Sequence, residues 1–227
     1  MHKFLLTAKP RMNLFTGSSK VAEILARDLH GIIKLEDAGF DWKILGPDVM
    51  CEDLVAFTSD QDAYAYSGQK CSAQSILFVH ENWKKVGIVD KLKSLASRRK
   101  LNDLTVGPVL SVTNRTFQSH MKDLLSISGS RVAFGGELLK GHSIPDCYGS
   151  WEPTAVYIPI DMMLKAEYFD LVTTEIFGPF QIIIDYKDAE LDKVLELTER
   201  MHANLTAAVV SNDIVFQSKV IFEYKIP

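Results

Sequence analysis

Cys71 is the residue whose surroundings best suit a nucleophile. It lies in the segment Ser-Gly-Gln-Lys-Cys-Ser-Ala (residues 67–73), among small and polar residues just before a predicted strand. Glycine lets a backbone approach a ligand closely, and Lys70 beside the cysteine favours the thiolate, which is the reactive form. The alternative is a small buried hydrophobe, the usual role of cysteine. Cys51 and Cys147 lack such surroundings, and we expect them to be core or bystander residues.

Glu36 is a candidate general base. It follows an apolar strand pattern and precedes Asp-Ala-Gly (residues 37–39). A carboxylate at the end of a buried strand, beside a flexible turn, can have a raised pKa and accept a proton. The alternative is a solvated loop acid, which is commoner. The residues themselves leave both interpretations open.

Two further segments could hold a nucleotide. Gly17 and Ser18 stand at a predicted strand-to-helix turn, where free N–H groups can bind phosphate, although neither G-x-G-x-x-G nor G-x-x-x-x-G-K-[ST] is present. An ordinary capped helix is the alternative. Glu175 and Phe177 lie in a compact Gly-Pro turn, and an acid two residues from an aromatic could clamp a ribose and a flat ring. A purely structural turn is the alternative there.

Strand and helix patterns alternate along the chain, which is typical of an α/β sheet with helical cover. Apolar or β-branched runs predict strands at residues 13–15, 32–35, 75–80, 131–134, 154–158, 181–185 and 205–210. Periodic apolar residues predict helices at residues 20–30, 48–64, 86–100, 117–125 and 189–200.

Composition excludes several classes of protein. The chain has 227 residues, a net charge of -4 and 47% hydrophobic residues, so no excess of basic charge favours nucleic acid or an anionic membrane. Its three cysteines form no CxxC pair, which argues against a structural zinc site and a disulfide framework, and we expect no metal. No apolar run approaches the roughly 20 residues that span a bilayer, and no targeting signal is readable.

Four segments, in this order, resemble motifs of the aldehyde dehydrogenase superfamily. Phe-Thr-Gly-Ser (residues 15–18) is similar to its cofactor turn and Leu-Glu-Asp-Ala-Gly (35–39) to its general-base motif. Gly-Gln-Lys-Cys (68–71) resembles the nucleophile motif, and Glu-Ile-Phe-Gly-Pro (175–179) the motif whose acid holds the nicotinamide ribose. The resemblance extends to about Asp213. It implies a three-layer α/β/α catalytic domain over residues 38–227, preceded by a remnant of a Rossmann-like NAD-binding domain over residues 1–37.

Within the superfamily, residues 36–43 and 71–75 resemble the plant-type 1-pyrroline-5-carboxylate dehydrogenases. The resemblance implies NAD-dependent oxidation of L-glutamate γ-semialdehyde to glutamate in proline catabolism, in the mitochondrial matrix, by a homo-oligomeric enzyme. It implies Cys71 as nucleophile, Glu36 as the base that activates water, and Ser72 as a contact to the substrate carboxylate. Gly17, Ser18, Glu175 and Phe177 are the implied cofactor contacts.

The chain departs from the family at several points. Ala22 stands where the cofactor turn usually has a second glycine, and Asp37 and Ala38 replace an apolar residue and glycine. Most of the dinucleotide domain, one oxyanion donor, the substrate anchor loop and the oligomerisation segment have no counterpart. Losing one oxyanion donor costs ~3 kcal/mol of transition-state stabilisation. We therefore expect a fragment that lacks both ends of the family chain and has little or no dehydrogenase activity.

Two alternatives remain. A Cys-His hydrolase could pair Cys71 with His202 and Asn204, with Gln69 just before the cysteine, although the flanking pattern of such enzymes is absent. The chain could also be a non-catalytic fragment or splice product that is unstable or associates with full-length subunits.

Overall fold

The computed structural model describes residues 2–8, 10–37, 39–201 and 204–223. The chain divides into two compact units, Met1–Gly39 and Phe40–Pro227. Ala38 and His202, which belong to two of the sequence patterns above, lie outside the described residues. Along the described ranges, no helix combines the length and apolar composition needed to cross a bilayer.

The first unit is a βαβ element preceded by a short helix. It comprises α1 (His2–Ala8), β1 (Asn13–Thr16), α2 (Ser19–Asp28) and β2 (Ile33–Glu36), and β1 pairs with β2 in parallel. The bounds of β1, α2 and β2 agree closely with the predicted elements, whereas α1 is not among them. Leu25 and Leu29 are buried, but Val21 and Ile24, predicted on the same face, stay 44% and 36% exposed because two strands cover only part of the helix.

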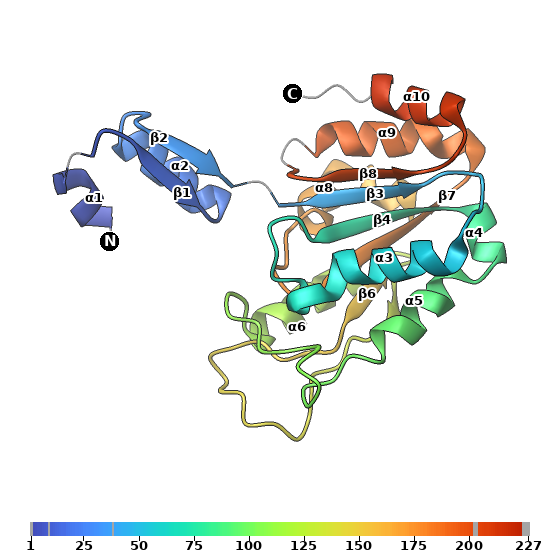
Figure 1. The fold of residues 1–227 in the computed structure, drawn as a ribbon, viewed down its shortest axis with the longest axis horizontal. Coiled ribbons are helices and arrows are strands. Elements are labelled where there is room, and N and C mark those ends of the chain that lie inside the picture. The colour runs from blue at the N-terminus through green and yellow to red at the C-terminus, as the bar shows by residue number, and fades with distance from the viewer. Residues whose placement is uncertain (1, 9, 38, 202–203, 224–227) are drawn as a thin grey trace. The chain divides into compact units, whose positions relative to one another are not determined.

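The second unit contains a six-stranded sheet in the order β5-β6-β7-β4-β3-β8, in which only β5 is antiparallel to its neighbour (Figure 1). The strands are β3 (Asp41–Leu45), β4 (Gln74–His80), β5 (Arg131–Phe134), β6 (Thr154–Tyr157), β7 (Phe180–Tyr186) and β8 (Ala207–Val210). The helices are α3 (Glu52–Tyr64), α4 (Glu81–Lys85), α5 (Ile88–Ala96), α6 (Asn114–Leu125), α7 (Ile160–Met163), α8 (Ala166–Val172), α9 (Leu191–Arg200) and α10 (Ile214–Glu223), with 3-10 turns η1 (Ala65–Gly68) and η2 (Asp188–Glu190).

Alternation along the strands divides the core into two layers, because successive side chains of a strand point to opposite faces. Ile44, Ile76 and Ile182 pack with α6, α8, α9 and α10 on one face, whereas Leu77 and Ile183 pack with α3 and α5 on the other. The second unit is therefore a three-layer α/β/α structure, as predicted.

Strand β3 is absent from the predicted elements, although all five of its residues are buried. Charged residues interrupt its apolar pattern, so the sequence does not predict it. Lys43 is 4% exposed, and its ammonium donates to the carboxylate of Asp62 at 2.5 Å and to Ser59 Oγ at 3.3 Å, both on α3. A buried charge is tolerated when it is paired and hydrogen-bonded, so a strand pattern can include lysine when the partner lies elsewhere in the chain.

Helix boundaries also differ from the predicted ones. The helix predicted at residues 86–100 is α5, which covers Ile88–Ala96 and follows the separate short α4. Gly87 has a left-handed backbone (φ +69°) between them, which glycine adopts at no steric cost. Leu92 and Ala96 are buried as predicted, while Val86 and Val89 are only half-buried.

Candidate active site

Four of the predicted site residues lie at one edge of the large sheet, the edge formed by the amino ends of its parallel strands. Cys71 and Ser72 immediately precede β4, and Glu175 and Phe177 precede β7. Strands β4 and β7 are parallel neighbours, paired from Ile76 and Ile182 onward. The loops that lead into two adjacent parallel strands lie at the same edge of the sheet, so the topology brings these two segments together.

The loop that carries Cys71 has an unusual backbone. Tyr66, Ser67 and Gly68 have consecutive positive φ angles of 56°, 59° and 65°. Residues other than glycine rarely adopt this left-handed backbone conformation, which costs of order 1–3 kcal/mol where it occurs. Such strain persists only where the surrounding contacts impose it, so the contacts of this loop matter.

Because Gly68 has no side chain, the Cys71 loop can contact the Glu175–Phe177 turn directly. A Cβ atom at Gly68 would lie 2.1 Å from the carbonyl oxygen of Gly178. Gly178 is itself confined, because a Cβ there would lie 2.5 Å from the ring of Trp151. The two glycines of the predicted nucleophile and ribose motifs therefore permit direct backbone contact between the two loops.

Two side chains of the same loop hold residues 106–111 beside it. Gln69 donates through Nε2 to the Pro108 carbonyl (3.0 Å) and accepts at Oε1 from the Leu110 N–H (2.8 Å). Ser67 Oγ accepts from the Gly107 N–H at 2.7 Å. Gln69 is not among the predicted site residues, and its only signal in the sequence is an amide side chain two residues before the nucleophile.

Cys71 is half-buried and Ser72 is exposed. The Lys70 ammonium donates to the Gln61 carbonyl on α3 at 3.3 Å, and the Ala73 N–H donates to the Lys70 carbonyl at 3.1 Å. Lys70 thus anchors a tight turn around the cysteine. The expected effect of Lys70 on the thiolate stays a prediction.

Glu175 lies at the surface with a raised carboxyl pKa. Partial burial among neighbouring atoms is the main cause, and the nearby carboxylate of Asp41 adds to it. Asp41 begins β3, is 1% exposed, and accepts at Oδ1 from the N–H groups of Leu205 and Thr206, both at 2.7 Å. Burial is also the largest influence on Asp41, and it raises the pKa of this carboxyl. Two carboxyl groups with raised pKa values therefore share this edge of the sheet.

A series of buried hydrogen bonds connects the first residues of the strands next to the site. Gln74 donates to Gln181 Oε1 at 2.6 Å, Gln181 donates to the Tyr64 hydroxyl at 2.8 Å, and that hydroxyl donates to the Thr154 carbonyl at 3.1 Å. Burial raises the pKa of Tyr64 well above its usual range. These bonds join α3, β4, β6 and β7, so the loops preceding β4 and β7 start from fixed positions.

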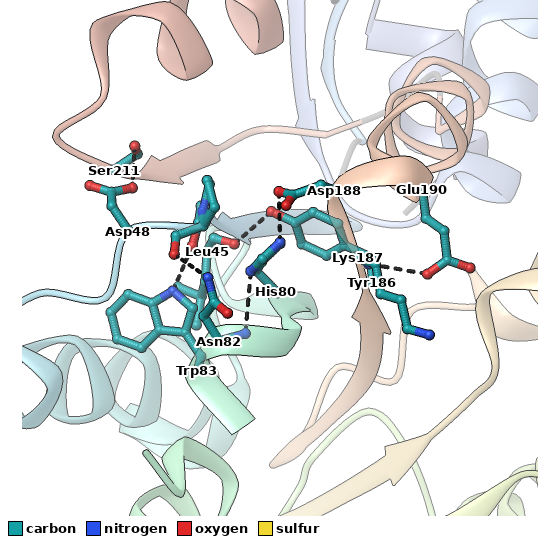
Figure 2. A network of polar contacts seen from close by, with 12 residues as sticks. Leu45, Asp48, His80, Asn82, Trp83, Tyr186, Lys187, Asp188, Glu190 and Ser211 are labelled. Atoms are coloured by element: carbon teal, nitrogen blue, oxygen red, sulfur yellow. Dashed lines mark hydrogen bonds and ion pairs between the residues drawn. The ribbon is translucent and has the colours of Figure 1, made fainter. Parts of the chain in front are cut away.

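A second polar network lies at the opposite side of the sheet, where the parallel strands have their carboxyl ends (Figure 2). The Tyr186 hydroxyl donates to the Leu45 carbonyl at 2.6 Å, and His80 Nε2 lies 3.0 Å from Asp188. His80 Nδ1 accepts from the Asn82 N–H at the start of α4. Asp48 accepts from the Ser211 hydroxyl at 2.5 Å. These contacts tie together the carboxyl ends of β3, β4, β7 and β8.

The remaining candidates lie in the first unit. Gly17 donates its N–H to the Glu36 carbonyl at 3.1 Å, and the Glu36 side chain is exposed at the end of β2. Ser18 has an extended backbone and precedes α2, and within the described residues its hydroxyl makes no capping bond. Gly17, Ser18 and Glu36 are thus neighbours within this unit, while Cys71, Ser72, Glu175 and Phe177 belong to the other.

The sequence profile of the aldehyde dehydrogenase family matches residues 3–225. The chain belongs to the aldehyde dehydrogenase family. Members of this family generally use NAD or NADP, and they act on small aldehydes. Among the residues that the structure describes, His, Cys, Asp and Glu side chains do not gather in groups of three or more that could hold a metal ion.

This aldehyde dehydrogenase chain has close relatives in plants. It is 64% identical over 222 residues to the protein of Arabidopsis thaliana named delta-1-pyrroline-5-carboxylate dehydrogenase 12A1, mitochondrial, in a match that covers 97% of this chain and 40% of the relative. It is 62% identical over 221 residues to a probable aldehyde dehydrogenase of Linum usitatissimum, with the same coverage. The chain therefore spans about 40% of the length of these relatives.

Solved structures share the fold of this family member. A mutant of proline utilization A from Bradyrhizobium japonicum matches with a TM-score of 0.81 at 23% identity, over 99% of this chain and 22% of that one. The gamma-glutamyl-gamma-aminobutyraldehyde dehydrogenase of Burkholderia cenocepacia matches with a TM-score of 0.74 at 22% identity, over 98% of this chain and 44% of that one. These likenesses show the aldehyde dehydrogenase fold.

Proposed function

We propose that this chain carries the chemistry of an NAD-dependent 1-pyrroline-5-carboxylate dehydrogenase, which oxidises L-glutamate γ-semialdehyde to glutamate in proline catabolism. The supporting observation is the 64% identity to a plant protein of that name along 97% of the chain. The direct contact of the Cys71 loop with the Glu175–Phe177 turn supports the same proposal. The relative's name also supports a mitochondrial location, and homo-oligomerisation stays a prediction from the family resemblance.

Cys71 is the proposed nucleophile. Its thiolate attacks the aldehyde carbon and forms a carbon–sulfur bond, while the carbonyl electron pair moves to the oxygen and produces an oxyanion. The Cys71 N–H is one proposed donor to that oxyanion. Collapse of the oxyanion to a thioester would release a hydride from the carbon, and bound NAD would supply the acceptor for it. Ser72, exposed beside the cysteine, is the proposed contact to the carboxylate of the substrate.

Glu36 is the proposed general base for the second half of the reaction. Its exposed carboxylate takes a proton from water, and the resulting hydroxide attacks the thioester carbon. The carbon–sulfur bond then breaks, which releases glutamate and regenerates the Cys71 thiolate. Glu36 carries this role by its place in the motif of residues 35–39.

Each unit by itself offers residues that suit one part of a dinucleotide. The Glu175 carboxyl reaches the surface at the same sheet edge as Cys71 and can accept hydrogen bonds from ribose hydroxyls, with Phe177 beside it. Ser18 precedes α2, where helix N–H groups favour phosphate, and Gly17 lies in the same turn. Residues 1–37 are accordingly proposed as part of the NAD-binding domain, and residues 38–227 as the catalytic domain.

The proposal is tested by following NADH formation with pyrroline-5-carboxylate as substrate. The purified chain is compared with Cys71→Ala and with Cys147→Ala, which removes an exposed thiol elsewhere in the second unit. Activity that disappears only in Cys71→Ala would support the chemistry and would overturn the expectation of an impaired chain. A folded chain without activity would instead favour the non-catalytic alternative.

A further inference from the structure

A cavity of about 520 Å³ lies in the second unit, formed by the end of α5, the end of β5 and residues 139–141 and 152–153. None of its lining residues belongs to the Cys71 loop or to the Glu175–Phe177 turn. Its volume lies in the range of small-molecule sites, roughly 300–1,000 Å³. The proposed reaction assigns it no role.

Positive charge dominates the lining of this cavity. Lys93, Lys100, Lys140 and Arg99 face a single acidic residue, Glu152. In residues 2–8, 10–37, 39–201 and 204–223, the ammonium groups of the three lysines have no hydrogen-bond or ion-pair partner. Three unpaired cations around one concave space raise the local concentration of anions.

The C-terminus of α5 explains only part of this charge. Cations near a helix C-terminus stabilise it by interacting with the helix dipole, which accounts for Lys93 in the last turn of α5 and for Arg99 and Lys100 just beyond it. Lys140 comes from a separate segment, between β5 and β6, and lines the same cavity. The helix therefore gives no reason for a lysine at that position.

Arg99 is held in place at the cavity wall. Its Nη2 donates to Asp60 Oδ2 at 2.5 Å and to the Asp60 carbonyl at 3.4 Å. The Arg99 side chain is 10% exposed and that of Asp60 is 1% exposed. Arg99 Nε is buried and has no hydrogen-bond partner among the described residues. The ion pair with Asp60 holds the guanidinium in place, so it loses little freedom when an anion binds beside it.

The other wall of the cavity is also rigid. Leu139 donates its N–H to the Ser150 carbonyl, and Glu152 donates its N–H to the Glu137 carbonyl, both at 3.0 Å. A Cβ on Gly135 would lie 2.3 Å from the Pro153 carbonyl oxygen, so this turn is tightly packed. The segments carrying Lys140 and Glu152 are therefore linked by backbone hydrogen bonds.

We propose that this cavity binds a small polyanion, an organic molecule with two or more phosphate or carboxylate groups, at a site separate from the proposed active site. The lysines supply mobile cationic donors and Arg99 supplies a fixed one, which is the arrangement that suits clustered anionic oxygens. Phe134 and Ala96 also line the cavity and give it an apolar part that can contact the carbon skeleton of the ligand.

The test is calorimetric titration of the full chain at about 20 mM salt, where surface electrostatics are weakly screened. Inorganic pyrophosphate is the phosphate probe and citrate the carboxylate probe. The double variant Lys100→Gln/Lys140→Gln is compared with Lys3→Gln/Lys122→Gln, which removes the same charge from exposed positions outside the cavity. We expect saturable binding that weakens about tenfold or more in the first variant and changes little in the second.

Stronger binding of pyrophosphate assigns a phosphate ligand, and stronger binding of citrate assigns a polycarboxylate. No saturable binding of either probe, or equal weakening in both variants, would overturn the proposal. Amide NMR of the unsubstituted chain gives a second readout that does not depend on how the variants fold. The Gly135 and Gly141 signals should shift when the bound probe is added, and unchanged signals would contradict the proposed location.

Discussion

Gly68 and Gly178 approach each other so closely that a Cβ on Gly68 would lie 2.1 Å from the Gly178 carbonyl oxygen. Gly68 also has a φ of +65°. Its hydrogen side chain therefore meets two requirements, a left-handed backbone and a backbone–backbone contact. Because Cys71 lies three residues after one glycine and Glu175 three residues before the other, this contact constrains where the proposed nucleophile and ribose acid can lie within the second unit.

We predict that Gly68→Ala lowers the free energy of unfolding by about 3 kcal/mol, because the added Cβ must displace backbone. Gly141→Ala is the matched control. Gly141 has a φ of +69°, and an added Cβ there would meet nothing within 4 Å, so it reports the cost of the left-handed backbone alone, about 1 kcal/mol. Urea denaturation measures both variants. Equal losses would mean that the close approach to Gly178 contributes nothing.

Gln69→Leu should release residues 106–111 from the Cys71 loop. The Leu110 N–H loses its acceptor, and a net hydrogen bond worth about 1 kcal/mol corresponds to roughly fivefold faster amide exchange. Hydrogen exchange of the Leu110 amide measures this effect. Gln118→Leu changes an exposed glutamine on α6 and should leave that rate unchanged. An unaltered Leu110 rate in Gln69→Leu would show that the side chain does not hold the loop.

Ester hydrolysis tests the proposed nucleophile independently of the cofactor, because acyl transfer to a thiolate needs no NAD. We expect the chain to hydrolyse p-nitrophenyl acetate, Cys71→Ala to lose at least about 90% of that rate, and Cys147→Ala to retain it. Release of p-nitrophenol is measured with and without NAD. If Cys71→Ala keeps the full rate, another group performs the hydrolysis and the assignment of Cys71 fails.

Asp41 should make stability fall as pH rises. Burial raises the pKa of this carboxyl above its ordinary value of 3.8, so the folded state binds the proton more tightly than the unfolded state. Between 3.8 and the raised value the folded state holds more protons, and the free energy of unfolding decreases with pH through that window. Asp41→Asn should flatten this decrease in urea midpoints measured from about pH 4 to 7.

Glu175 provides an independent readout of Asp41→Asn. Burial and then the Asp41 carboxylate raise the pKa of Glu175, so removing that negative charge should lower it. Carboxyl carbon NMR of Glu175 measures the change, with Asp146→Asn, an exposed site, as the control. A Glu175 pKa that is the same in both variants would show that the two carboxyl groups do not interact.

Much of the element order is readable from local sequence. Helices such as α6 and α9 have periodic apolar faces, and β4 and β7 are apolar runs, so each is predicted close to its observed bounds. Strand β3 is not, because Asp41 and Lys43 interrupt its apolar pattern. Their partners, Leu205, Thr206 and Asp62, lie far along the chain or on another element, and local periodicity carries no information about them.

The sequence by itself determined the family and the candidate residues, because residue types in ordered motifs are local properties of the chain. Only the tertiary structure decided that the Cys71 loop contacts the Glu175–Phe177 turn, that Gln69 holds residues 106–111, and that Lys140 lines the same cavity as Lys93 and Lys100. Each of these contacts joins segments separated by tens of residues. They depend on strand order and on loop packing, which arise when the whole chain buries its apolar surface together.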